Sequence, residues 1–161
     1  MDFMATPVIR LYVDDSWNPH VRRMGCGAVL RDDSNNWKSA TSVSFDHGTA
    51  FLAEITDVEL GMQHSHDLGY KNIVCASDCN RLVTFLSSGS DTNTFWDRES
   101  IRRVLALMTT FQSCYVVHIA RERNNTADTL AREAARLGSP VQTWSTPPSF
   151  VAAAMFLDDS T

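Results

Sequence analysis

The feature that most constrains this chain is a change of hydrophobic period about a third of the way along it. Three stretches with the composition or alternation of β-strands come first, at 8–14, 25–31 and 37–45, and the turn-forming run 32–36 joins the last two into a predicted hairpin. From residue 50 onward, apolar residues recur at helical spacing, with short apolar runs between the helical stretches. This order predicts an α/β fold: a mixed five-stranded sheet, three antiparallel strands and then two further strands, with helices on both faces.

The second half of the pattern fills in the remaining elements. Helices are predicted at 50–68, 80–86, 97–111 and 124–137, the last ended by Gly138, and strands at 72–77 and 114–119. The run at 72–77 is almost wholly apolar, which is typical of a central strand covered on both faces. A polar loop is predicted at 87–93. We therefore expect an N-terminal tail at 1–7, one folded domain at 8–138, and a C-terminal tail at 139–161 with a short helix.

Composition limits the classes of function. The formal net charge is −5, from 14 Lys and Arg against 19 Asp and Glu, which argues against binding nucleic acid or an anionic membrane through bulk positive charge. It does not exclude an enzyme of nucleic acids whose site is a cluster of carboxylates. No apolar run could span a membrane, no secretory leader is apparent, and the four cysteines form no CxxC pair. We expect an intracellular protein, nuclear or cytoplasmic, with reduced thiols.

Four acidic residues fall at corresponding places in the predicted elements. Asp14 ends the first strand and Asp78 the fourth, while Glu54 and Asp128 lie in the first turns of two helices. Strand ends and the helix starts beside them meet at one rim of an open α/β sheet. Carboxylates gathered there repel one another unless hard cations neutralise them, and Mg²⁺ binds carboxylate and phosphate oxygens together. The pattern favours phosphodiester chemistry.

The same segments carry a family resemblance over residues 9–157. In chain order they read VDDSW (13–17), GCGAVLRD (25–32), NNWKSA (35–40), LAE (52–54), ASD (76–78), HIARERNNTADTLAREA (118–134) and WSTPPSFVAAAMFLDD (144–159). Together they resemble the ribonuclease H superfamily, type 1, and most closely the plant domains related to retrotransposon reverse transcriptases. The resemblance implies a metal-dependent endoribonuclease that cuts the RNA strand of RNA–DNA hybrids.

Residue roles follow from that resemblance. Asp14 would bridge two Mg²⁺ ions, Asp128 would hold the ion on the side of the attacking water, and Glu54 with Asp78 the ion on the leaving-group side; Mn²⁺ is the substitute ion. His118, in the loop after the fifth strand, would shuttle protons or help product leave. We interpret Asn124 as the cap of the last helix, and Trp17, close in sequence to Asp14, as the tryptophan best placed to stack on a base.

The chain also departs from the family pattern. Asp15 stands where the family usually has a small residue, often Gly, and adds bulk and negative charge. The interval 79–112 has a net charge of only +1 and so lacks the basic extension of bacterial enzymes. We therefore expect a monomer that binds hybrid weakly, by shape, without a membrane partner and with no protein partner indicated.

Three other functions account for parts of the pattern or of the departures from it. A proofreading exonuclease needs Asp-x-Glu in the first strand, which this chain lacks. A transposase could use Asp14, Asp78 and Glu133, but would leave Glu54 and the segment 118–128 unexplained. The serious alternative is a domesticated domain of weak or no activity that serves as an interaction module for nucleic acid or protein, a hypothesis that Asp15 and the acidic balance favour.

Overall fold

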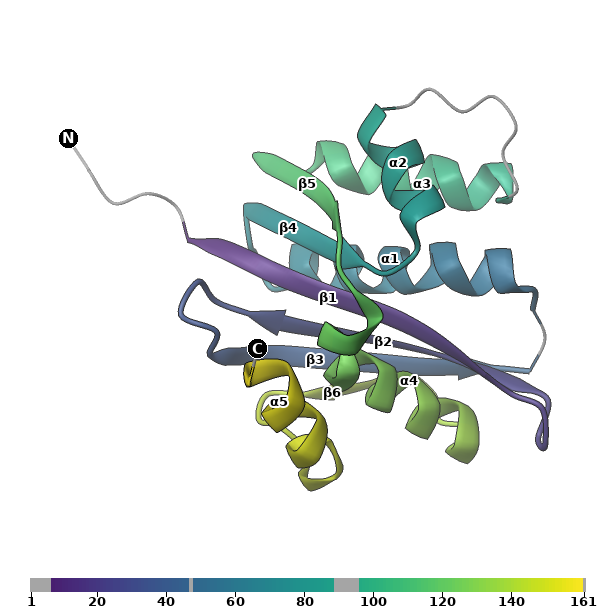
Figure 1. Cartoon of the computed structure of the whole chain (residues 1–161). Coiled ribbons are helices and arrows are strands. Elements are labelled where there is room, and N and C mark those ends of the chain that lie inside the picture. The colour runs from purple at the N-terminus through teal and green to yellow at the C-terminus, as the bar shows by residue number, and fades with distance from the viewer. Residues whose placement is uncertain (1–6, 47, 89–95, 161) are drawn as a thin grey trace.

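A computed structural model describes residues 7–46, 48–88 and 96–160 (Figure 1). Its elements run β1 (Val8–Asn18), β2 (Arg23–Arg31), β3 (Trp37–Phe45), α1 (Ala50–Asp67), β4 (Asn72–Ser77), α2 (Asn80–Ser88), α3 (Arg98–Thr109), β5 (Ser113–His118), α4 (Asn125–Leu137), β6 (Gln142–Trp144) and α5 (Ala152–Asp159). Short 3₁₀ turns precede α4, at Arg121–Arg123, and α5, at Ser149–Val151. The predicted α/β architecture is confirmed.

The sheet has six strands in the order β5-β4-β1-β2-β3-β6. The strands from β1 through β2 and β3 to β6 are antiparallel neighbours, whereas β4 and β5 continue from β1 in parallel. The prediction of five strands was therefore one short. The extra strand, β6, lies in the segment expected to be a tail, and it pairs with β3 through only three residues. A strand of that length carries too little periodicity to be recognised.

Several boundaries differ by one to four residues from the sequence prediction, and two of them concern β1 and α2. Strand β1 continues to Asn18, beyond the predicted end at Asp14, because Asp14 to Asn18 pair in register with Gly27 to Arg23 of β2. The polar stretch predicted as a loop at 87–93 begins inside α2, which includes Ser87 and Ser88; the remainder of that prediction lies outside the described residues. Helix α4 ends as predicted, with Gly138 in the left-handed conformation at φ 67° and its N–H donated to Ala134 O.

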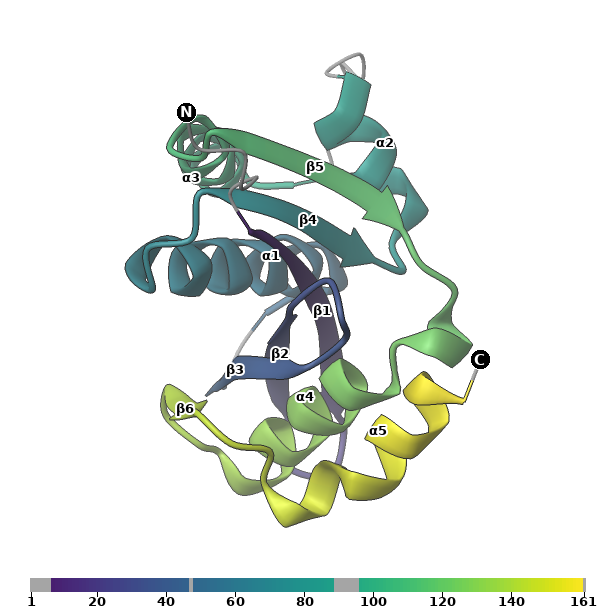
Figure 2. The same ribbon diagram turned by 90° about the vertical axis from the view of Figure 1, so that its left-hand side faces the viewer.

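Two hydrophobic cores cover the two faces of the sheet (Figure 2). Strand alternation divides them: Leu11 and Val13 of β1 belong to the core with α1, α2 and α3, whereas Tyr12 packs into the core beneath α4 and α5. The second core centres on Val29, Ala40, Ala127, Leu130 and Val151, with Trp37, Trp144 and Met155 packed against it. The segment 139–159 thus contributes β6 to the sheet and α5 to the cover of the second core.

Helix α4 approaches β2 unusually closely because β2 contains glycines where the two elements cross. A Cβ on Gly25 would lie 2.0 Å from Ala131 O, and one on Gly27 would lie 2.6 Å from Ala127 O. Both clashes would be with helix backbone, which cannot rotate away as a side chain can. The glycines therefore hold the start of α4, which carries Asp128, close to the centre of the sheet. Among the described residues, no helix is both long and apolar enough to cross a membrane.

Candidate active site

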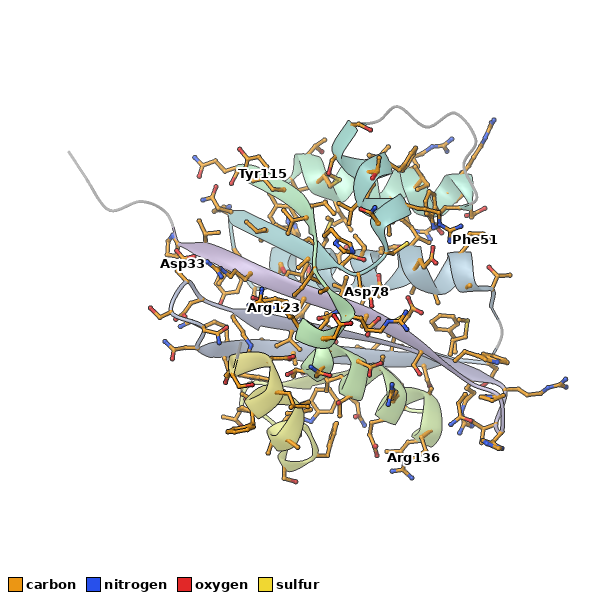
Figure 3. The ribbon with its side chains drawn as sticks, in the orientation of Figure 1. Asp33, Phe51, Asp78, Tyr115, Arg123 and Arg136 are labelled. Carbon is orange, nitrogen blue, oxygen red and sulfur yellow. The ribbon has the colours of Figure 1, made fainter. Side chains whose placement is uncertain are left out.

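The four predicted carboxylates meet in one open pocket of about 570 Å³. Its lining comprises Asp14, Asp15, Ser16, Glu54, Asp78, Cys79, Arg121, Glu122, Asn125, Asp128 and Arg132. Figure 3 shows Asp78 near the middle of the molecule, where β4 ends. The structure thus brings together Asp14, Glu54, Asp78 and Asp128, as the sequence suggested. The segments before and within α4 add two arginines and one glutamate to the lining.

Each carboxylate is placed by a different element. Asp14 lies within β1, opposite Gly27 of β2, and Asp78 directly follows β4, the parallel neighbour of β1. Glu54 lies in the second turn of α1, a helix whose start is fixed by Thr49: its hydroxyl accepts the N–H of Leu52 at 3.1 Å. Asp128 lies in the first turn of α4. One strand, one strand end and two helix starts therefore converge on the pocket.

Asp14 is the most buried of the four, with 8% of its surface exposed. Its Oδ1 accepts the backbone N–H of Asp15 at 2.9 Å. Loss of hydration on burial, and then repulsion from Asp78, raise the pKa of Asp14 from 3.8 to about 8. A carboxylate in this position holds a proton at neutral pH unless a cation is bound beside it.

The other three carboxylates each pair with an arginine. Arg81 contacts Glu54 at 3.3 Å, Arg121 contacts Asp78 at 3.5 Å, and Arg132 contacts Asp128 at 3.0 Å. These arginine side chains are 54%, 85% and 71% exposed, and pairs so exposed to solvent add little stability. The guanidinium groups neutralise the three carboxylates, and breaking these exposed ion pairs would cost little free energy of folding.

Glu54 has a second, more rigid partner. The indole Nε1 of Trp96, a residue only 3% exposed, donates to Glu54 Oε2 at 3.2 Å. Arg81 lies over the ring of Phe51, 4.9 Å from its centroid, which steadies the guanidinium next to Glu54. Burial raises the pKa of the Cys79 thiol in the same pocket, which keeps that thiol protonated.

Two further acids lie next to the four carboxylates: Asp15, which lines the same pocket, and Asp57, which is buried. Asp15 and Asp57 of α1 are in hydrogen-bonding contact, and Asp57 is 2% exposed. Burial raises the pKa of Asp15 to about 6 and that of Asp57 well above its usual range. Among the described residues, the three acids whose ligand oxygens lie within 4.8 Å of one another are Asp14, Asp15 and Asp57, and not the four predicted acids.

Asn124 occupies the N-cap position of α4, as predicted, but its side chain makes no capping hydrogen bond, so that part of the prediction was wrong. Its Nδ2 donates instead to Val13 O at 2.8 Å, beside Asp14. The cap comes from α5: the carboxylate of Asp158 accepts the N–H groups of Asn125 and Thr126 at 2.8 and 2.9 Å and the Thr126 hydroxyl at 2.7 Å. The last helix of the chain thus stabilises the start of the helix that carries Asp128.

His118 is placed differently from the loop position expected for it. It is the last residue of β5, its side chain is exposed, and it is not among the residues that line the pocket. Its backbone pairs with Ser77, the residue before Asp78, so it lies one strand away from the pocket wall. Trp17 is 47% exposed and lines a different pocket, with Val21, Arg22, Asp46 and Gly48.

Several residues in the pocket or in contact with its acids were not predicted from the sequence. Arg132 follows Asp128 by one helical turn, a spacing that predicts an ion pair. Asp57 lies four residues from both Ala53 and Gly61, which are buried on the same face of α1. An acid between two small buried residues on one helix face was a readable signal of a buried carboxyl group. Trp96 and Arg121 reach the pocket through tertiary contacts that no local pattern marks.

Comparison with known proteins agrees with this architecture. A family model described as reverse transcriptase-like matches residues 13–134. Similar solved structures include RNase H1 of the archaeon Halobacterium salinarum NRC-1, at 24% identity and TM-score 0.72 over 79% of this chain and 96% of that one. Another is the N-terminal RNase H domain of a Mycobacterium tuberculosis protein, at 20% identity and TM-score 0.74, over 82% of this chain and 96% of that one.

A third similar structure is LC11-RNase H1, a compost protein obtained by a metagenomic approach, in complex with an RNA/DNA hybrid. It has 20% identity and a TM-score of 0.72, over 80% of this chain and 97% of that one. At these identities the likeness establishes the fold. No curated protein sequence matches the chain.

Proposed function

Because this chain belongs to the reverse transcriptase-like family of ribonuclease H domains, we propose that it hydrolyses the RNA strand of RNA–DNA hybrids with divalent cations held by Asp14, Glu54, Asp78 and Asp128. The observation that carries the proposal is the convergence of these carboxylates, from β1, α1, the end of β4 and α4, in one open pocket. Mg²⁺ is the proposed ion and Mn²⁺ its substitute.

The residues present suit hard cations. Asp14 is buried among other acids and its pKa rises to about 8, so its ionised form needs positive charge nearby. Arg81, Arg121 and Arg132 supply such charge at the outer carboxylates, and because they are exposed they can give way to ions. When bound, two divalent ions supply an activated water and stabilise charge on the attacking and leaving oxygens.

The protein's own groups would then position the substrate. If the carboxylates held cations, the guanidinium groups of Arg81, Arg121 and Arg132 would lie where they can contact phosphates of the hybrid backbone. Trp96 holds Glu54 in place through its indole N–H, and Asn124 ties the segment before α4 to β1 beside Asp14. His118, on the neighbouring strand end, is proposed to exchange protons with substrate or product at the rim.

Few phosphate contacts imply weak, shape-based binding of the hybrid by a monomer. If three arginines each contact one phosphate, the logarithm of the binding constant should fall with the logarithm of salt concentration with a slope of about −2 to −3. A much steeper slope would show a larger basic surface than the three arginines provide. Sequence is not read in this scheme, because the 2′-hydroxyl and the groove shape distinguish hybrid from duplex DNA.

The test is cleavage of labelled hybrid, duplex RNA and duplex DNA of one sequence, with Mg²⁺ or Mn²⁺ and with chelator. We expect internal cuts in the RNA strand of the hybrid that leave 5′-phosphate ends and require the metal. Asp78→Asn should abolish cleavage without loss of fold, whereas Asp33→Asn, in the exposed β2–β3 turn, should cleave like the wild type. Comparable cutting of duplex DNA, or full activity of Asp78→Asn, would refute the assignment.

One observation favours a second candidate function. Asp15 stands where the family usually has a small residue, and it adds a carboxyl group to a pocket that already contains four. A domain that binds hybrid or protein without cleaving is the alternative. Metal-dependent binding of hybrid, with no cleavage in either metal, would favour this interaction module.

A further inference from the structure

Asp15 and Asp57 form a pair of acids that the proposed reaction does not use. In β1, Asp15 has the same parity as Leu11 and Val13, so its side chain leaves the sheet on the face covered by α1. Asp57 lies on α1 and is buried against that face. Strand alternation and the packing of α1 therefore bring together two acids 42 positions apart in the chain.

Basic side chains compensate the pair only in part: Arg121 acts on Asp15 and lowers the pKa of its carboxyl group, but less than burial raises it. The arginines near the pocket contact Glu54, Asp78 and Asp128, and in residues 7–46, 48–88 and 96–160 no ion pair reaches Asp14, Asp15 or Asp57. Asp57 is 98% buried, and its Oδ1 has no hydrogen-bond partner. A buried carboxyl oxygen without a partner costs stability unless something positive or hydrogen-donating occupies the space beside it.

We propose that Asp14, Asp15 and Asp57 form an inner binding site for a hard divalent cation of the Mg²⁺ and Mn²⁺ class. This site shares Asp14 with the four carboxylates and adds Asp15, which lines the same pocket, and the buried Asp57. Each residue offers an oxygen, and the three oxygens lie within 4.8 Å of one another. Oxygens bound to one such cation at about 2.0–2.6 Å are separated by up to about twice that distance, so this spacing fits a single ion.

The chemistry of the donors supports a hard ion. All three ligands are carboxylates, with no sulfur or imidazole donor in the group, and carboxylate oxygen selects Mg²⁺, Mn²⁺ or Ca²⁺ over softer metals. An ion there would supply the partner that Asp57 Oδ1 lacks. It would also explain why an aspartate at position 15, costly beside four other acids, occurs with a second acid directly behind it.

The site is tested by counting Mn²⁺ bound to the full chain, with free Mn²⁺ measured by electron paramagnetic resonance. Asp57→Asn keeps the shape of the side chain and removes its charge, so it should bind one Mn²⁺ fewer per chain than the wild type. The matched control is Asp67→Asn, an exposed position on the same helix that accepts a hydrogen bond from Gln63, and it should bind as many as the wild type. Asp15→Asn provides a second variant should Asp57→Asn fold poorly.

Equal Mn²⁺ counts for the wild type and for folded Asp57→Asn or Asp15→Asn would overturn the site, and would leave Asp15 and Asp57 as a carboxyl pair that shares a proton. The site does not depend on the proposed cleavage. Asp78→Asn lacks a ligand of the outer pocket, yet it should keep the inner ion. Cleavage that requires Asp78 with no loss of Mn²⁺ in Asp57→Asn would refute the inner site alone, whereas one Mn²⁺ lost from a protein that cleaves nothing would refute the nuclease alone.

Discussion

Replacing Asp14 by Asn should change how the stability of the metal-free protein depends on pH. The folded protein raises the pKa of Asp14 from 3.8 to about 8, so between pH 5 and 7 the folded state holds a proton that the unfolded state has released. Stability from this group is complete below pH 3.8 and is lost as pH rises towards 8. The wild type should therefore become less stable from pH 5 to pH 7 in chelator.

The size of the effect follows from the number of protons. One proton held only by the folded state changes the free energy of unfolding by about 1.4 kcal/mol per pH unit, or about 3 kcal/mol from pH 5 to 7. Asn at position 14 cannot take up that proton, and its side-chain oxygen can still accept the Asp15 N–H. Asp14→Asn should thus flatten the slope by about this amount, because the variant has no group at position 14 that takes up a proton on folding.

The assay is urea unfolding of both proteins in chelator at pH 5, 6 and 7, with unfolding free energies compared at each pH. His64 acts in the opposite direction, since burial lowers its pKa and its contribution to stability grows as pH rises; because His64 is common to both proteins, its effect cancels in the difference. Saturating Mn²⁺ should remove most of the wild-type slope. A wild-type stability that is flat or rises over this range, or equal slopes in the two proteins, would refute the reasoning.

Three further substitutions test the supports of the pocket. Gly27→Ala puts a Cβ 2.6 Å from Ala127 O and should cost about 2–3 kcal/mol of stability in urea melts; an unchanged midpoint would show that α4 can move away. Asp158→Ala removes the cap on Thr126 and should lower the free energy of unfolding by about 1–2 kcal/mol and weaken Mn²⁺ binding. Unchanged Mn²⁺ binding would show that the cap does not support the metal ligands. His118→Ala should slow hybrid cleavage about 100-fold with unchanged melting, and a smaller loss would deny it proton transfer.

The sequence was most informative where local pattern and tertiary environment agree. The apolar run at 72–77 forms β4 with the predicted bounds. A strand buried on both faces is almost wholly apolar, so its limits can be read from the sequence. The pocket carboxylates could be anticipated because they occur at strand ends and helix starts, positions that any α/β topology brings to one rim. Asp14 was an exception in detail: β1 runs four residues past it because β2 offers pairing partners that far.

Tertiary contacts account for what the sequence did not reveal. Asn124 has the residue type of a helix cap, yet Val13 O takes its amide, and Asp158 caps the helix from 33 positions away. Capping propensity describes only what a residue can do for its own helix. Here the hydrogen bond of Asn124 to Val13 O and the cap supplied by Asp158 replace that local interaction. Asp57 lies between Ile55 and Val58 on α1, and all three are buried. The apolar spacing that predicts the helix does not show that an acid shares its buried side.

The cap supplied by Asp158 has a consequence for the order in which the domain can be completed during synthesis. A ribosome delivers β1, β4 and α4 before α5, so the N–H groups at the start of α4 wait for an acceptor until the final segment has emerged. Strands and helices made earlier can collapse onto the sheet in the meantime. The start of α4 around Asp128 would then be completed only after α5 has emerged, later than the strands that place Asp14 and Asp78.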